Sequence, residues 1–141
     1  MSLPKELVLE VVTPEKLLVR ETVDEVELPG AEGYLGILPG HTPLLGILKV
    51  GEMWYRKGTT KSYLSLAFGF VEVLPDKVTV LAQIAERAED IDVARAESAR
   101  QRAEARLAKP PADLDYERAS IALSKAMSRL KTATHAGVSR H

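Results

Sequence analysis

Hydrophobic and polar residues follow two different periods along the chain, and the change comes near residue 86. Before it, apolar residues alternate with polar ones or gather in short runs bounded by Gly and Pro, which is typical of β-strands. After it, Ala and Leu recur at intervals of three and four between Arg, Lys and Glu, which is the period of an amphipathic helix. The pattern predicts a strand-rich first half followed by helices.

The first half predicts closely spaced strands joined by tight turns. The expected strands cover residues 7–11, 17–20, 23–28, 34–36, 44–48, 50–57, 61–66, 68–74 and 77–83. Lys57-Gly58-Thr59 and Pro75-Asp76 lie between pairs of these strands and indicate hairpin turns. Because no helical stretch separates the strands, we expect an antiparallel β-sandwich or barrel.

The second half predicts two helices. Asp90 or Asp92 can cap the first, which is expected over residues 91–108 and ends at two consecutive prolines. Asp113 can cap the second, which is expected over residues 114–133. The short connection between them favours an antiparallel helical hairpin.

The apolar stripe of this hairpin is thin, since most of its positions are alanine. A buried leucine contributes about 1.5–3 kcal/mol, and an alanine methyl well under half of that. The sequence therefore fits either a detachable element or a small cap that simply packs on the sheet. The stripe consists of Ala96, Ala99, Ala103, Leu107, Ala119, Ala122 or Leu123, Ala126, Met127 and Leu130.

Composition excludes several classes of protein. The 141 residues are 45% hydrophobic and 28% charged, with a net charge of −1, which is the balance of a soluble globular protein without general attraction to polyanions. There is no cysteine, so disulfides and thiolate metal sites are excluded. The three histidines, of which His135 and His141 are close to the C-terminus, make a histidine-rich metal site a poor fit. No apolar run is long enough to span a membrane, and the N-terminus lacks the pattern of a secretory signal.

Charge divides at the same place as the hydrophobic pattern. Residues 1–85 carry 8 basic and 11 acidic side chains, whereas residues 86–141 carry 11 basic and 9 acidic ones. We place the boundary between the two parts near Glu86–Asp90.

Two stretches are distinctive enough to indicate a family. The first is Gly33-Tyr34-Leu35-Gly36-Ile37-Leu38-Pro39-Gly40-His41, and the second joins the strand 78–83 to the segment 85–96. Together they resemble the epsilon subunit family of the F-type ATP synthase. The resemblance covers residues 6 to 130 and includes the order of the strand-rich and helical parts.

The resemblance implies a fold and a non-catalytic role. It implies a ten-stranded antiparallel β-sandwich over residues 1–86, which binds the gamma subunit and the membrane-embedded proteolipid ring and rotates with both. It implies a regulatory two-helix hairpin over residues 87–133, which folds down on the sandwich or extends toward the alpha/beta catalytic head and inhibits ATP hydrolysis. We expect a mobile tail at 134–141, a monomer in isolation, and a peripheral location at the cytoplasmic face of the bacterial plasma membrane.

The glycine- and proline-rich stretch is the expected subunit interface. Rigid loops on a sandwich commonly carry binding, and the candidate residues here are Tyr34, Gly36, Pro39, Gly40 and His41. His41 has no nucleophile or carboxylate beside it in the sequence, so we expect a structural or interface role. Tyr34 departs from the family, which often has an acidic residue there, so the resemblance does not carry over a polar contact with the ring at this position.

The start of the first helix resembles a nucleotide-recognition motif. Members of the family whose folded-down hairpin binds ATP carry the pattern Ile-Asp-x-x-Arg-Ala, matched here by Ile91, Asp92, Arg95 and Ala96. The resemblance adds Glu86, Arg102, Lys125 and Arg129, and Lys125 stands where a bidentate arginine would hold phosphate better. ATP would then be a regulatory ligand rather than a required cofactor. The alternative is that Asp92 is only a helix cap and the arginines a solvated face.

Rival functions remain open. A helical-hairpin interaction module without nucleotide sensing fits the same pattern. Acidic residues interleaved with the arginines disfavour a nucleic-acid binder. The lack of any paired acid, nucleophile or P-loop pattern disfavours an enzyme. A third rival is a homo-oligomer joined through its helices.

Overall fold

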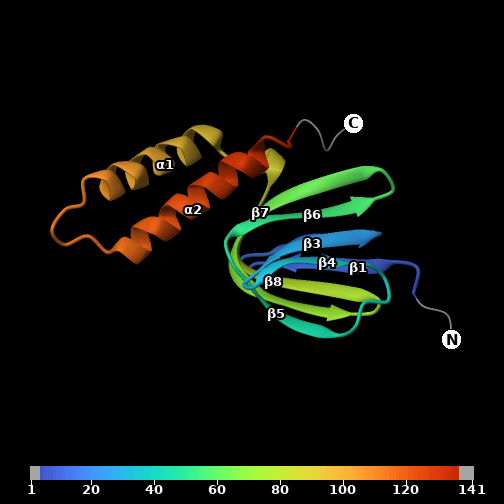
Figure 1. Cartoon of the computed structure of the whole chain (residues 1–141). Coiled ribbons are helices and arrows are strands. Elements are labelled where there is room, and N and C mark those ends of the chain that lie inside the picture. Colours follow the sequence, from blue (N-terminus) through green and yellow to red (C-terminus); the bar gives the residue numbers. More distant parts are fainter. Residues whose placement is uncertain (1–3, 137–141) are drawn as a thin grey trace.

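The computed structural model describes residues 4–136, which fold into a β-sandwich with a helical hairpin at one end (Figure 1). The strands are β1 (Leu7–Val12), β2 (Leu17–Val23), β3 (Glu25–Gly30), β4 (Gly33–Ile37), β5 (Leu44–Leu48), β6 (Gly51–Lys57), β7 (Thr60–Leu74) and β8 (Lys77–Arg87). A 3₁₀ turn, η1 (Ala88–Asp90), leads to α1 (Val93–Ala108) and α2 (Tyr116–Ala133). Residues 137–141 of the expected tail lie outside the described residues.

The strands form one sheet that folds over to make two layers. Its order is β2-β1-β8-β7-β5-β3-β4, and β6 pairs with both β3 and β7. The first part of β7 pairs with β6, and its last part pairs with β5, so this long strand belongs to both layers. The fold class is confirmed, but β1 and β8 are parallel, which corrects the expectation of an antiparallel sandwich at this one pair.

The described residues form eight strands, whereas the resemblance implied ten and the sequence pattern predicted nine, and β7 is continuous where the pattern predicted two strands. The sequence predicted separate strands at 61–66 and 68–74, with a break at Ala67. In the structure the chain bends at Phe68 and Gly69, which have φ values of 64° and 145°, and β8 stays paired on both sides of the bend. A Cβ on Gly69 would lie 2.1 Å from the carbonyl oxygen of Leu81, so only glycine fits this close approach.

The core lies between the two layers and consists of apolar side chains with one tyrosine. All eight strands contribute to it, mainly through every second residue along each strand, as the period of two predicts. The tyrosine is Tyr55, whose pKa is raised by burial and by a hydrogen bond with Glu21. The core residues are Leu7, Leu9, Val11, Val19, Val23, Val26, Leu28, Ile37, Leu48, Met53, Tyr55, Leu64, Leu66, Val71, Val73, Val78, Val80 and Ala82.

The two helices form the expected antiparallel hairpin, although both begin two residues later than predicted. Asp92 caps α1, since its carboxylate accepts a hydrogen bond from the amide of Arg95 at 3.1 Å. Asp113 was predicted to cap α2, and this was wrong: Asp115 does so, accepting from the amide of Arg118 at 3.1 Å. The two prolines are followed by a turn before α2, so the helix starts at the second aspartate rather than the first.

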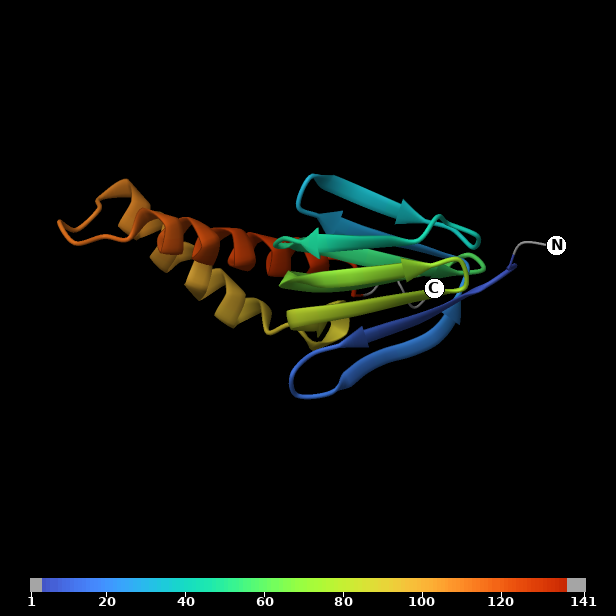
Figure 2. The ribbon, with the colours of Figure 1, turned by 90° about the horizontal axis from the view of Figure 1, so that it is seen from below.

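The hairpin is attached to the sandwich by one end and projects away from it (Figures 1 and 2). Contact with the sheet is made mainly by α2, whose C-terminal half lies against β6 and β7. Ala96, Ala103, Ala119 and Ala126 are the buried apolar side chains of the two helices. Met127 was predicted to lie in the stripe, but its side chain is more than half exposed, whereas that of its neighbour Ala126 is buried.

Candidate functional sites

The predicted interface loop lies at the end of the sandwich away from the hairpin. The amide of Gly40 donates to the carbonyl of Pro75 at 2.7 Å, which fixes the loop beside the β7–β8 turn. β8 runs from this turn toward the hairpin, so the loop and the helices are at opposite ends. His41 turns back on its own loop, where Nδ1 lies 2.7 Å from the carbonyl oxygen of Thr42. Pro39 in this loop is half-buried and Gly36 is exposed close to the end of β4 that leads into it. Tyr34 is also exposed, but it lies toward the other end of β4, where it pairs with Pro29.

A second surface, which sequence reasoning missed, is an exposed row of large apolar side chains. Ile47, Phe70 and Leu81 are direct neighbours across β5, β7 and β8. Their exposed fractions are 62%, 61% and 51%, and that of Leu45, two residues along β5, is 78%. Hollows of about 470 and 680 Å³ are both lined by Ile47, Phe70 and Leu81, and Leu45 lines the first of them. We call Leu45, Ile47, Phe70 and Leu81 the apolar face.

The sequence carries a signal for this face. A strand with one solvated side should place polar residues at every second position. In β5 the sequence Leu-Leu-Gly-Ile-Leu is apolar on both sides, and Phe70-Val71 in β7 and Val80-Leu81 in β8 behave alike. Since only one side of each strand faces the core, the other side predicts a contact with something outside the chain.

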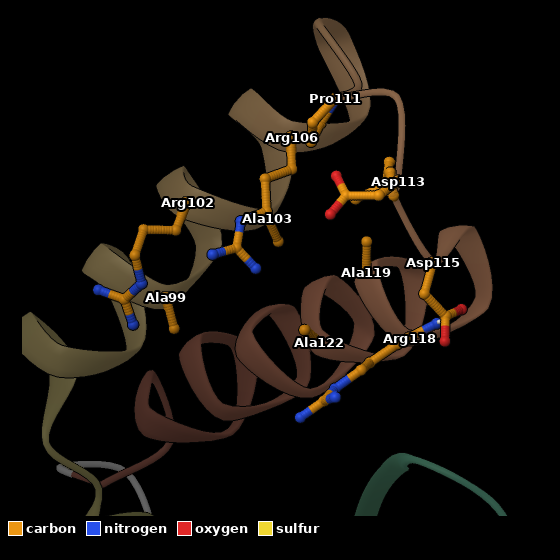
Figure 3. A pocket seen from close by; sticks show the side chains of 11 residues that line it. Ala99, Arg102, Ala103, Arg106, Pro111, Asp113, Asp115, Arg118, Ala119 and Ala122 are labelled. Carbon is orange, nitrogen blue, oxygen red and sulfur yellow. Dashed lines mark hydrogen bonds between the residues drawn. The ribbon is translucent and has the colours of Figure 1, made fainter.

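A basic hollow of about 570 Å³ lies between the helices near their connection (Figure 3). Its floor is made of small side chains from both helices, namely Ala99, Ala103, Ala119 and Ala122. Arg102 and Arg106 approach it from α1, and Arg118 from α2. Three guanidinium groups around one hollow can bind an anion such as phosphate. Asp113 and Asp115 stand at its loop end and offset part of this charge.

A second hollow of about 290 Å³ lies between the hairpin and the sandwich. Glu86, Lys125 and Arg129 line it, together with Ala99 and Ala122, which also line the basic hollow. Arg129 pairs with Glu86 through two contacts, Nε to Oε1 at 2.7 Å and a hydrogen bond from a terminal nitrogen to Oε2 at 3.2 Å. The first contact is an ion pair without hydrogen-bond alignment, since Nε has no aligned acceptor. Lys125 lies over the ring of Phe68, 5.7 Å from its centre.

The predicted nucleotide-binding residues are thus only partly brought together. Glu86, Lys125 and Arg129 share one hollow, and Arg102 lines the adjoining one. The four residues of the Ile-Asp-x-x-Arg-Ala pattern line neither: Asp92 caps α1, Arg95 is exposed, and Ile91 and Ala96 are buried. Whether these eight residues bind a nucleotide stays a prediction.

No helix among residues 4–136 is long and apolar enough to cross a membrane. Within the same residues, no cluster of His, Asp or Glu side chains is arranged to hold a metal ion.

Comparisons with known proteins point to one family. The family model described as ATP synthase, Delta/Epsilon chain, beta-sandwich domain matches residues 6–88, and that for the long alpha-helix domain matches residues 89–134. The ATP synthase epsilon chain of Solibacter usitatus is 50% identical over 131 residues, covering 93% of this chain and 98% of the relative. That of Koribacter versatilis is 60% identical over 99 residues, covering 70% of this chain and 69% of the relative.

Solved structures share the fold at low sequence identity. A chain of the Euglena gracilis mitochondrial ATP synthase, OSCP/F1/c-ring in rotational state 1, superposes with a TM-score of 0.82 at 23% identity. The alignment covers 96% of this chain and 85% of that one. A chain of the Tetrahymena thermophila mitochondrial ATP synthase central stalk/c-ring gives a TM-score of 0.54 at 17% identity, covering 96% and 98%.

Proposed function

Because the chain belongs to the ATP synthase delta/epsilon chain family, we propose that it is a coupling and regulatory subunit of the rotor. Family members are non-catalytic subunits of the complex, so its function lies in what it contacts. Its sandwich binds the gamma subunit and the proteolipid ring, and its hairpin regulates ATP hydrolysis. In a bacterial complex this places it at the cytoplasmic face of the plasma membrane as a peripheral subunit.

The observation that carries the coupling role is the apolar face. Four large side chains more than half exposed lie together on neighbouring strands. Single exposed leucines are ordinary, but a row of this kind is typical of a surface covered by a partner. We assign the apolar face to the gamma subunit. The loop with Gly40 and His41 is assigned to the proteolipid ring, because it is a separate rigid projection at the end of the sandwich.

Binding to the gamma subunit tests the coupling role. Phe70→Glu places a charge at the centre of the apolar face, and it faces solvent in the free chain, so the fold is preserved. We expect the affinity for gamma to fall about 100-fold, the loss typical of a central contact residue. Met127→Glu is the matched control, since Met127 is 54% exposed but lies on α2. Equal affinity of the Phe70→Glu chain and the unchanged chain would refute the assignment.

Regulation is assigned to the hairpin because its attachment to the sandwich is narrow. It contacts the sheet through one half of α2, and its buried apolar side chains are alanines. Extension toward the alpha/beta head would carry Arg118, Lys125 and Arg129 to acidic surfaces there. Charge reversal on α2 should then relieve inhibition of ATP hydrolysis, measured on the assembled complex.

ATP sensing is a second candidate function, favoured by the two adjoining hollows. Glu86, Lys125 and Arg129 line one, three arginines line the other, and Ala99 and Ala122 belong to both. A nucleotide that bridged α1, α2 and the sandwich would bind the docked hairpin and not the extended one, and such a difference in affinity shifts the equilibrium between them.

Calorimetric titration of the full chain with ATP tests this second function. We expect binding to be lost in Arg129→Ala and weakened in Arg95→Ala. Arg100→Ala is the matched control, because Arg100 is occupied by Glu97 and Glu104 on its own helix. If the unchanged chain does not bind ATP, the interaction module without nucleotide sensing is the correct alternative and the coupling role is unaffected.

A further inference from the structure

The C-terminal end of α2 meets the sandwich through polar side chains of β6 and β7. Glu52, Tyr63 and Ser65 are on the outer face of these strands, where Glu52 and Ser65 are paired across the sheet. The hydroxyl groups of Ser65 and Ser128 lie 3.1 Å apart, and Thr132 follows one helical turn later. This end of the hairpin is therefore held by a different kind of contact from the apolar core beneath it.

Four residues form the last polar contact between the end of the hairpin and the sandwich. The Thr132 hydroxyl donates to Glu52 Oε2 at 3.0 Å, and Nε2 of His135 lies 3.4 Å from Glu52 Oε1. The His135 ring stacks on that of Tyr63, with centres 3.8 Å apart and planes 10° from parallel. We call Glu52, Tyr63, Thr132 and His135 the C-terminal clasp.

Glu52 is the residue through which the clasp favours the docked hairpin over the undocked one. It is only 9% exposed, and a buried carboxylate is destabilising unless polar partners satisfy it. Its hydrogen-bond donor Thr132 and its ion-pair partner His135 both belong to the hairpin side of the contact. When the hairpin leaves, Glu52 returns to water and needs neither, so its charge favours docking only while these partners are in place.

We propose that the C-terminal clasp holds the hairpin on the sandwich and does so more tightly when His135 is protonated. The proposal deepens the regulatory role above and rests on the hairpin being mobile. It identifies which contact sets the docked population, and it makes that population responsive to pH.

The groups around His135 give the direction of the pH effect. Glu52 faces it from β6 and Tyr63 from β7, and Lys131 lies nearby on α2 itself. Burial, followed by the charge of Glu52, raises the pKa of the Tyr63 hydroxyl, so this phenol stays neutral near neutral pH. Imidazole is the side chain that titrates in this range. A protonated His135 forms an ion pair with Glu52 and a neutral one does not, so docking weakens as the pH rises.

Thiol labelling measures the docked population directly, because the chain contains no cysteine. Ser65 is 5% exposed beneath α2, so a Ser65→Cys thiol reacts with a small thiol reagent only when the hairpin leaves. Thr60→Cys at the exposed start of β7 is the reference for the chemical effect of pH on thiol reactivity. The measured quantity is the labelling rate of the Ser65→Cys chain divided by that of the Thr60→Cys chain. This ratio is determined in the full chain at pH 6 and again at pH 8.

We expect this ratio to be about three- to tenfold higher at pH 8 than at pH 6, the range of a partly buried ion pair. His135→Ala should bring the pH 6 value up to the pH 8 value and abolish the difference. Glu52→Gln should act in the same way, since a neutral amide gains nothing from the imidazolium. His41→Ala, which removes a histidine at the far end of the sandwich, should keep the full difference.

Four outcomes would overturn the proposal. One is a ratio in the unchanged chain that does not depend on pH, and another is the same pH dependence in His135→Ala as in His41→Ala. The other two separate the clasp from the mobile hairpin. If Arg129→Ala opens the hairpin but the clasp variants do not, the clasp is wrong and the mobile hairpin stands. If no variant exposes the thiol, the mobile hairpin itself is wrong.

Discussion

The interior of the sandwich is built from large apolar side chains, whereas the contact beneath α2 is built mainly from polar and charged ones. The interior is filled with Leu, Val, Ile and Met side chains that are almost completely removed from water. The contact beneath α2 joins Ser65 to Ser128, Glu86 to Arg129 and Glu52 to Thr132, with alanine as its main apolar residue.

This difference in side chains explains how one chain could combine a sandwich that stays folded with a hairpin that detaches. Each buried Leu or Val contributes about 1.5–3 kcal/mol to the sandwich, and this is lost in any opened state. A hydrogen bond across the α2 contact is exchanged for one with water when the helix leaves, so its net contribution is about 0.5–1.5 kcal/mol. We therefore expect the hairpin to leave the sandwich without unfolding it.

The largest effect is expected where the sandwich interior is emptied. Leu64 is completely buried on β7, so Leu64→Ala leaves a cavity and should lower the free energy of unfolding by about 2–5 kcal/mol. Urea unfolding followed by far-ultraviolet circular dichroism measures this loss. A change below about 1 kcal/mol would mean that the interior is not the source of the stability.

The next effect concerns the strongest polar contact beneath α2. Arg129→Ala leaves the half-buried Glu86 without its partner, which should weaken docking by about 1–3 kcal/mol. The sandwich itself should unfold at the same urea concentration as before. Limited proteolysis should then cut the hairpin faster, whereas Arg100→Ala, whose contacts stay within α1, should leave the cutting rate unchanged.

A smaller effect separates the cap that the structure contains from the one that the sequence suggested. Asp115→Ala removes the hydrogen bond to the amide of Arg118 and should destabilise α2 by about 1 kcal/mol. Asp113→Ala should change the helix signal very little. Amide exchange rates in the first turn of α2 measure both, and equal effects of the two substitutions would contradict the assignment of the cap.

The smallest effect is expected for an ion pair on the surface of the sandwich. A hydrogen bond from Lys77, 2.8 Å from Glu10, lowers the pKa of the Glu10 carboxyl. The pair therefore stabilises the fold above the unfolded-state pKa of Glu10, and this contribution is lost as the pH falls through the lowered pKa. Lys77→Met should return the Glu10 pKa toward its ordinary value, as followed by NMR titration, with little change in stability at neutral pH.

The sequence predicts the strands and helices of this molecule better than it predicts how the strands bend and pair. The strand and helix segments follow from periods of two and three to four. Asp90 and Asp92 were both candidate caps of the first helix, and Asp92 is the cap that the structure contains. A strand break was predicted at Ala67, beside the bend at Phe68 and Gly69, because no local rule distinguishes a bend that keeps its pairing from one that loses it. The parallel pairing of β1 with β8 joins residues about seventy positions apart, which no local pattern encodes.

The sites show the same limit. Glu86 and Arg129 were both predicted, and the structure joins them, but it shows their charges satisfying each other. The clasp was not predicted at all, because Glu52 and Tyr63 lie on neighbouring strands whereas Thr132 and His135 come from the far end of the chain. The apolar face could have been predicted, since apolar residues on both sides of β5 stand plainly in the sequence.

The central claim is that the hairpin leaves the sandwich as a unit while the sandwich stays folded. Native-state amide hydrogen exchange of the full chain, measured at increasing low urea concentrations, tests it most directly. We expect α1 and α2 to exchange through an opening of lower free energy and weaker urea dependence than β1, β7 and β8. If helices and strands exchanged with the same free energy and the same urea dependence, the chain would unfold as one cooperative unit and the claim would be contradicted.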